Sequence, residues 1–118
     1  MTNVLKIINT EMQNLNIPYT YDGWDKELEL PQFIGELSEV PTLDEDGLNE
    51  YTLILTGYAV KEDVDYLYSV AKRLKLRYKP SRIVDGIAIM YNNVMPVETN
   101  TDGLKQIQIT LKIKDWSV

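Results

Sequence analysis

The stretch YTLILTGYAV, residues 51–60, decides the fold class of this chain. It is rich in β-branched and aromatic residues, and it is apolar enough to lie in the centre of a sheet. The next stretch, KEDVDYLYSVAKRLKLRY (residues 61–78), predicts a helix, with acids in its first turn and bases in its last. Its apolar side chains recur at helical spacing, and the expected buried stripe is Val64, Leu67, Tyr68, Ala71 and Leu74.

Both ends of the chain carry regular patterns as well. Residues 3–15 place apolar side chains at helical spacing. Asn16 and Pro18 end this helix, because the residue before a proline avoids helical geometry. Residues 104–116 alternate between apolar and polar side chains, as half-buried antiparallel strands do; the expected core positions are Ile107, Ile109, Leu111 and Ile113.

Three weaker strand patterns lie between these elements, at residues 17–24, 28–37 and 82–91. Pro31 confines the second of them to an edge or a bulge, while residues 38–50 and 95–103 predict loops. We therefore expect one domain, residues 1–118, of the α+β class. Its core is a small, mainly antiparallel sheet of four to five strands, with two helices packed on one face.

Two residue types are missing from the chain, and their absence excludes much chemistry. There is no cysteine, which excludes disulfides, thiolate nucleophiles and Cys-based metal sites. There is no histidine, which excludes Ser-His-Asp and Cys-His catalysis. We expect a protein that is not an enzyme and that uses no cofactor.

The remaining patterns favour a cytoplasmic protein. No stretch reaches the roughly 20 apolar residues that a membrane span requires, and the first residues lack the pattern of a signal peptide. The net charge of −6 argues against direct nucleic-acid binding, because phosphates would repel the protein as a whole.

Charge is distributed very unevenly along the chain. Residues 21–50 carry ten acids and one lysine, a net charge of −9, whereas the rest of the chain carries +3. A run without acids follows in the second half: Lys72, Arg73, Lys75, Arg77, Lys79 and Arg82. Such segregation permits head-to-tail contact between copies, although two solvated faces would show the same pattern.

The acidic segment raises two further possibilities. Asp44, Glu45, Asp46 and Glu50 could hold Ca²⁺ or Mg²⁺, but their spacing differs from that of a calcium loop and favours a solvated loop. Acids around Phe33 could form a glycosidase-type carboxylate pair, but nothing in the sequence places a substrate between them.

Three stretches resemble small morphogenesis proteins of tailed phages and prophages of Gram-positive bacteria. IPYTYDGWDKELELPQFIGELSE (residues 17–39) resembles that family's "IPY…W…YPYFVGEY-E" segment, with LPQF in place of YPYF. EDGLNEYTLILTGYAV (residues 45–60) looks like its "E-G-…-LTG" strand. MPVETNTDGLKQIQITLKIKDW (residues 95–116) looks like its closing "P-TD…LK-IQI-L-IK-W" strand.

The resemblance implies a structural protein of the tail-terminator or tail-completion type, which forms a ring at the head–tail junction. It implies a homo-oligomer that contacts tail-tube or connector proteins, in the host cytoplasm during assembly and then in the virion. The acidic segment of one copy would face the basic run of its neighbour. The expected interface residues are Glu27, Glu29, Phe33, Glu36, Glu39, Lys72, Arg73, Lys75 and Arg77.

One alternative from a different class stays open. An acidic cytosolic binding module, of the inhibitor or immunity type, would use the same acidic segment to mask one basic partner protein. Self-association separates the two hypotheses, because such a module would be monomeric on its own.

Overall fold

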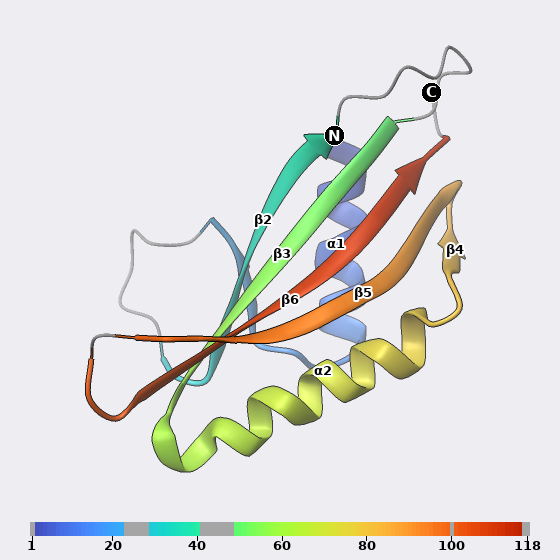
Figure 1. The fold of residues 1–118 in the computed structure, drawn as a ribbon. Coiled ribbons are helices and arrows are strands. Elements are labelled where there is room, and N and C mark those ends of the chain that lie inside the picture. The colour runs from blue at the N-terminus through green and yellow to red at the C-terminus, as the bar shows by residue number, and fades with distance from the viewer. Residues whose placement is uncertain (1, 23–28, 41–48, 100, 117–118) are drawn as a thin grey trace.

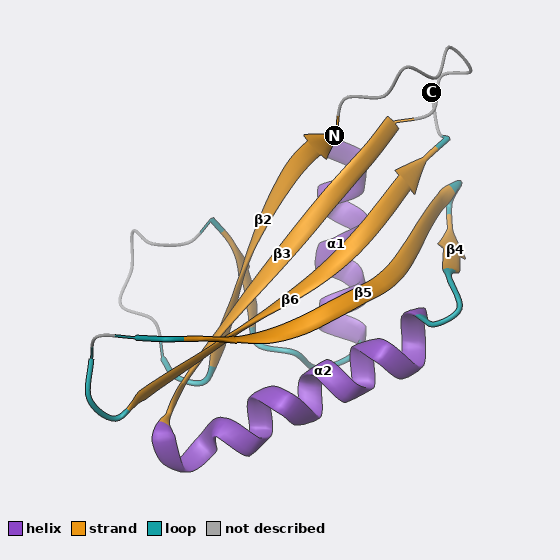
Figure 2. Cartoon of the chain, viewed as in Figure 1, coloured by secondary structure: helices purple, strands orange, loops and turns teal. Residues whose placement is uncertain are grey.

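The computed structural model describes residues 2–22, 29–40, 49–99 and 101–116 of the chain. Two helices and a six-stranded sheet form an α+β fold, which confirms the predicted class (Figures 1 and 2). The elements in chain order are α1 (Thr2–Asn14), β1 (Tyr19–Tyr21), β2 (Gln32–Val40), β3 (Asn49–Val60), the short 3-10 helix η1 (Lys61–Asp63), α2 (Val64–Tyr78), β4 (Arg82–Val84), β5 (Ile87–Val97) and β6 (Leu104–Asp115).

The sheet has the strand order β1-β2-β3-β6-β5-β4. The short strand β1 pairs with β2 in parallel, and every other pair of neighbours is antiparallel. The last strand in sequence, β6, therefore lies in the middle of the sheet between β3 and β5 (Figure 1). The mainly antiparallel sheet is as predicted, with six strands in place of four to five.

The additional strand comes from residues 82–91, which form two strands and not one. Asp85 and Gly86 separate β4 from β5, with φ angles of 50° and 81°. Two successive residues with positive φ make the tight turn that suits a β-hairpin. Strand β5 also continues to Val97, into residues that the sequence pattern had predicted as a loop.

The core lies between one face of the sheet and both helices. Along β3 and β6 buried and partly exposed residues alternate, and the register pairs Leu53 with Leu111 and Leu55 with Ile109. The four core positions expected in the last strand are all buried, each at most 1% exposed. Side chains of α1 and α2 join this same buried cluster, so both helices cover one face.

The two helices end where the sequence predicted, and the backbone geometry after each helix explains why. After α1, Asn16 has a φ of 55°, and the Ile17 amide donates to the Met12 carbonyl at 3.0 Å. This is the Schellman arrangement, in which asparagine tolerates the left-handed position. After α2, Lys79 is extended, as expected of a residue that precedes a proline.

The buried stripe of α2 is rotated from the expected one. Leu67, Ala71 and Leu74 are buried as predicted, and Val70 and Tyr78 are buried as well. Tyr68 was expected in the core, but it is 41% exposed. The rotation leaves Tyr68 on the outer side of the helix, beside the lysines described below.

Candidate functional site

The acidic side chains proposed for an interface lie at one edge of the sheet. Glu36 and Glu39 are exposed on β2, Glu29 is exposed just before this strand, and Asp22 is exposed directly after β1. We call these four residues the acidic edge. β1 pairs only with Phe33 to Gly35, so the last five residues of β2 are outermost among the described strands. Glu27 lies outside the described residues.

Phe33 does not belong to this surface. Its side chain is fully buried, and it lies opposite Gly57 in the neighbouring strand. A Cβ at Gly57 would come within 2.5 Å of the Phe33 ring, so the glycine makes room for the phenylalanine. The expectation that Phe33 contacts a neighbouring subunit is therefore corrected: it is a core residue.

The basic run of α2 and β4 divides by residue type. The three arginines turn inward: Arg73 donates to the Leu15 carbonyl at 2.8 Å, while Arg77 and Arg82 bind Glu11. The lysines at positions 72, 75 and 79 remain exposed. Residues four apart share one side of a helix, so Arg73 and Arg77 face α1 together. Arg73 and Arg77, both expected at an interface, are thus engaged within the chain.

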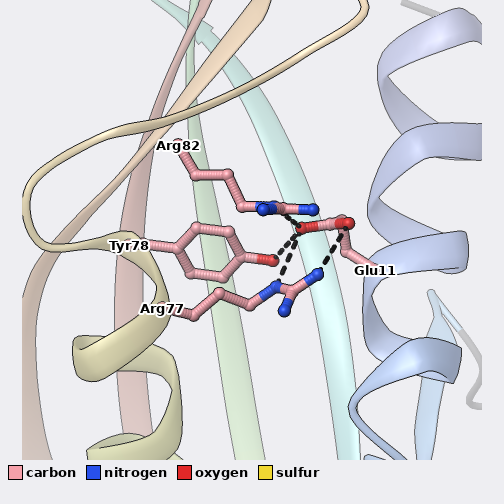
Figure 3. Close-up of polar contacts among 4 residues, drawn as sticks. All are labelled: Glu11, Arg77, Tyr78 and Arg82. Atoms are coloured by element: carbon pink, nitrogen blue, oxygen red, sulfur yellow. Dashed lines mark hydrogen bonds and ion pairs between the residues drawn. The ribbon is translucent and has the colours of Figure 1, made fainter.

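Glu11 is the buried centre of a polar cluster, which Figure 3 shows. It projects from α1 and is 3% exposed. Its Oε1 accepts from the Tyr78 hydroxyl at 2.8 Å, from Arg82 Nε at 3.0 Å and from Arg77 Nε at 3.1 Å. Its Oε2 accepts from Arg77 Nη2 at 3.2 Å. One carboxylate therefore fastens α1 to the end of α2 and the start of β4.

The partners of Glu11 control its charge. Burial by itself would raise the pKa of Glu11, but hydrogen bonds from Arg77 and Tyr78 and the charges of Arg77 and Arg82 lower it below its usual range. The pKa of the Tyr78 phenol is raised by burial and by the adjacent carboxylate. The cluster is thus an ionised carboxylate surrounded by donors, which is an arrangement that stabilises the fold.

The sequence analysis did not identify Glu11 as a structurally important residue, although its position in the first helix indicates one. Position 11 lies three residues after Ile8 and seven after Val4, on the stripe that those apolar residues define. A charged residue on a buried helix stripe requires a partner of opposite charge. The three arginines of the basic run were the available partners, and their long side chains could reach across the fold.

A groove lies between the outer side of α2 and strand β5. We call it the lysine groove; its volume is about 520 Å³, and its lining residues are Tyr68, Ala71, Lys72, Lys75, Leu76, Lys79, Tyr91 and Val94. Leu76 is 74% exposed there, so an apolar side chain faces solvent beside the lysines. A second hollow, of about 850 Å³, adjoins it at Tyr68 and lies between the start of α2 and the β5–β6 connection.

The acidic edge and the lysine groove lie on opposite sides of the molecule. The acidic edge follows β1 and β2, the first two strands in the sheet order, and the groove follows β5, next to the last strand β4 (Figure 1). The two sets of charges that the sequence suggested for contact are therefore not in contact within one chain. Each is available to a different molecule.

The hydroxyl of Tyr19 is a further buried polar group. The Tyr19 ring packs over Gly35, where a Cβ would come within 2.7 Å of it. No residue in the described ranges forms a hydrogen bond with the buried Tyr19 hydroxyl. Burial, with a smaller effect of Tyr21, raises the pKa of Tyr19 to about 12.

Other kinds of site can be assessed only for the part of the chain that the structure describes. Within it, no group of three or more acidic residues is arranged to hold a metal ion. Asp44, Glu45 and Asp46, which could hold a cation but whose spacing favours a solvated loop, lie outside these residues, so neither possibility is tested. None of the described helices is long and apolar enough to cross a membrane.

Comparison with known proteins identifies the fold but no family. No protein-family model and no curated protein matches the sequence. One similar solved structure, of a protein whose name states no function, has a TM-score of 0.55 and 13% sequence identity. The similarity covers 83% of this chain and 78% of that chain. At this identity it shows a shared α+β architecture alone.

Proposed function

We propose that this chain is a structural subunit of a phage or prophage, of the tail-terminator or tail-completion type, that acts by assembling with copies of itself. The motif resemblance in three stretches suggests the class of protein. The observation that supports assembly is the placement of opposite charges: exposed acids lie along β1 and β2, and exposed lysines lie along α2 beside β5.

This placement suits a repeated head-to-tail contact. Each copy offers an acidic edge along β1 and β2 and a basic groove between α2 and β5, on opposite sides of the molecule. A contact between two different surfaces leaves one of each unused, so further copies can add in the same way. If the rotation per copy divides a full turn evenly, the result is a closed ring, as a tail terminator requires.

The proposed location and partners follow from the class of protein. The subunit would be made in the host cytoplasm and would then become part of the virion at the head–tail junction. Its neighbours there would be tail-tube or connector proteins, which it would contact through surfaces other than those used between copies.

The acidic edge also favours a second candidate function. Asp22, Glu29, Glu36 and Glu39 are all exposed along this edge, with Glu36 and Glu39 on opposite faces of β2. Such an edge could mask a basic partner protein in the manner of an inhibitor or immunity protein. In that case the lysine groove has no role in binding, and the chain stays monomeric on its own.

The deciding experiment is to measure mass by light scattering over a concentration series, with and without added phage tail tubes, and to image the largest species by negative stain. We expect closed rings whose mass is a small multiple of 13.6 kDa. A monomer at every concentration, both free and with tail tubes, would overturn the proposal and favour the acidic binding module.

A further inference from the structure

We infer that the lysine groove of one copy receives the acidic edge of the next copy. This inference rests on the proposed function, and it names the two surfaces that would form the contact. The groove contributes Lys72, Lys75 and Lys79 around an apolar floor. The acidic edge contributes Asp22, Glu36 and Glu39. Tyr21 of β1 lies beside β2 there, opposite Gly35.

The strand directions allow this contact between copies in similar orientations. From β2 to β5 the sheet passes through three antiparallel pairings, so β2 and β5 run in opposite directions. A neighbour placed beyond β5 in a similar orientation therefore presents its β2 antiparallel to β5. No inversion of the second molecule is needed, which is a condition for a cyclic assembly.

Side chains, and not a continued sheet, carry the contact. The outer edge of β5 is irregular at Asn92, where the register with β6 shifts, and Pro96 has no amide hydrogen to donate. On β2, the Leu37 amide already donates to the Tyr21 hydroxyl at 3.3 Å. Both edges are therefore poorly suited to a new hydrogen-bonded ladder, and the groove beside β5 supplies the binding surface.

Apolar side chains are exposed on both surfaces. Leu76 and Tyr68 of the groove are 74% and 41% exposed, and Tyr21 at the acidic edge is 38% exposed. Exposed ion pairs contribute only about 0.2–1 kcal/mol each. Charge alone would therefore give specificity for the partner but too little binding free energy for a stable contact. Burial of these aromatic and aliphatic side chains at the centre, with charges at the rim, is the composition of a specific interface.

Charge exchange tests the pairing. The groove variant is Lys72→Glu with Lys75→Glu, and the edge variant is Glu36→Lys with Glu39→Lys. Each makes both surfaces of one copy alike in charge, so we expect self-association to weaken at least tenfold in either variant, an order-of-magnitude expectation for like charges in contact. In an equimolar mixture every contact between unlike variants pairs opposite charges, so association should recover as alternating copies in open chains or even-membered rings.

A matched control separates this effect from a change in net charge. Lys6→Glu with Lys112→Glu changes the net charge as the groove variant does, at exposed positions on α1 and β6. This control should assemble like the unaltered protein. If the groove variant also assembles normally, or if the mixture does not recover, the pairing is wrong while self-assembly, and with it the proposed function, still stands.

A cross-link tests the same contact without altering the balance of charge. Because the chain contains no cysteine, Glu36→Cys with Lys75→Cys introduces the only two thiols. Position 36 lies on β2 and position 75 lies on α2 in the groove beside β5, with β3 and β6 between β2 and β5, so a disulfide can form only between copies. Oxidation should give a ladder of covalent multimers, and Gln13→Cys with Lys75→Cys should give none. Equal ladders, or none in either protein, would overturn the pairing.

Discussion

The hydroxyl of Tyr78 donates a 2.8 Å hydrogen bond to Oε1 of Glu11, 67 residues earlier in the chain. Both side chains are almost fully buried, at 1% and 3% exposed. The bond joins the end of α2 to the third turn of α1, and the same oxygen accepts from two arginines. This carboxylate thus ties α1 to the last turn of α2.

Removal of the carboxylate should destabilise the fold. Glu11→Ala leaves Arg77 without its buried anion and the Tyr78 hydroxyl without an acceptor. We expect the free energy of unfolding to fall by about 3 kcal/mol, as for other buried ion pairs that lose one partner. Urea denaturation measures it. Glu62→Ala, at an exposed position of η1, should change the value by less than about 0.5 kcal/mol.

Stability should also decline in acid because of this residue. The pKa of Glu11 in the folded chain is below its ordinary value of 4.5. The contribution of Glu11 to the free energy of unfolding is therefore complete above pH 4.5. It is lost as the pH falls through the lowered pKa, because the unfolded chain binds the proton more readily than the folded chain does. In Glu11→Gln this part of the acid dependence should vanish. Parallel curves of unfolding free energy against pH for the two proteins would contradict the assignment.

The arginines and lysines of the basic run should differ in their effect on stability. Arg77→Ala removes two hydrogen bonds to Glu11, and Arg73→Ala removes the bond to the Leu15 carbonyl. We expect losses of about 2 and 1 kcal/mol in the free energy of unfolding. Lys72→Ala and Lys75→Ala should stay within about 0.5 kcal/mol, because both side chains are exposed. Thermal denaturation of the four variants at one pH measures the contrast, and equal losses would refute it.

Tyr19→Phe should leave the protein as stable as before or more so. The Tyr19 hydroxyl is buried without a hydrogen bond to any described residue, so its removal relieves a desolvation cost of about 1 kcal/mol. The substitution should also remove a phenol whose pKa is about 12 from a spectroscopic titration of the tyrosines. A clear loss of stability would mean that the hydroxyl has a partner in solution.

Much of the architecture was predictable, because periodicity reports directly on burial. The alternation from residue 104 onward placed Ile107, Ile109, Leu111 and Ile113 on the covered face, and all four are buried there. The division of residues 82–91 into two strands was missed, although Asp85-Gly86 between apolar residues is a strong hairpin signal. The residues on both sides of this turn have strand-forming side chains, so the whole stretch was predicted as one continuous strand.

The candidate site was less predictable, because composition does not reveal the direction in which a side chain points. Six basic residues follow one another without an acid, and nothing local distinguishes Arg73 from Lys72. Phe33 lies among acids in the sequence, yet it faces the core opposite Gly57. These outcomes depend on contacts between segments that are distant in the chain, which no local pattern contains.

The sequence by itself determined the class of fold, the helix ends and the segregation of charge, since these follow from hydrophobic spacing, from Asn16 and Pro80, and from composition. Only the tertiary structure decided which charges are free. The buried carboxylate of Glu11 binds Arg77 and Arg82, because a charge removed from water must be paired. Strand order then places the exposed acids along β1 and β2, away from the lysines of the groove beside β5, so one copy cannot bring them together.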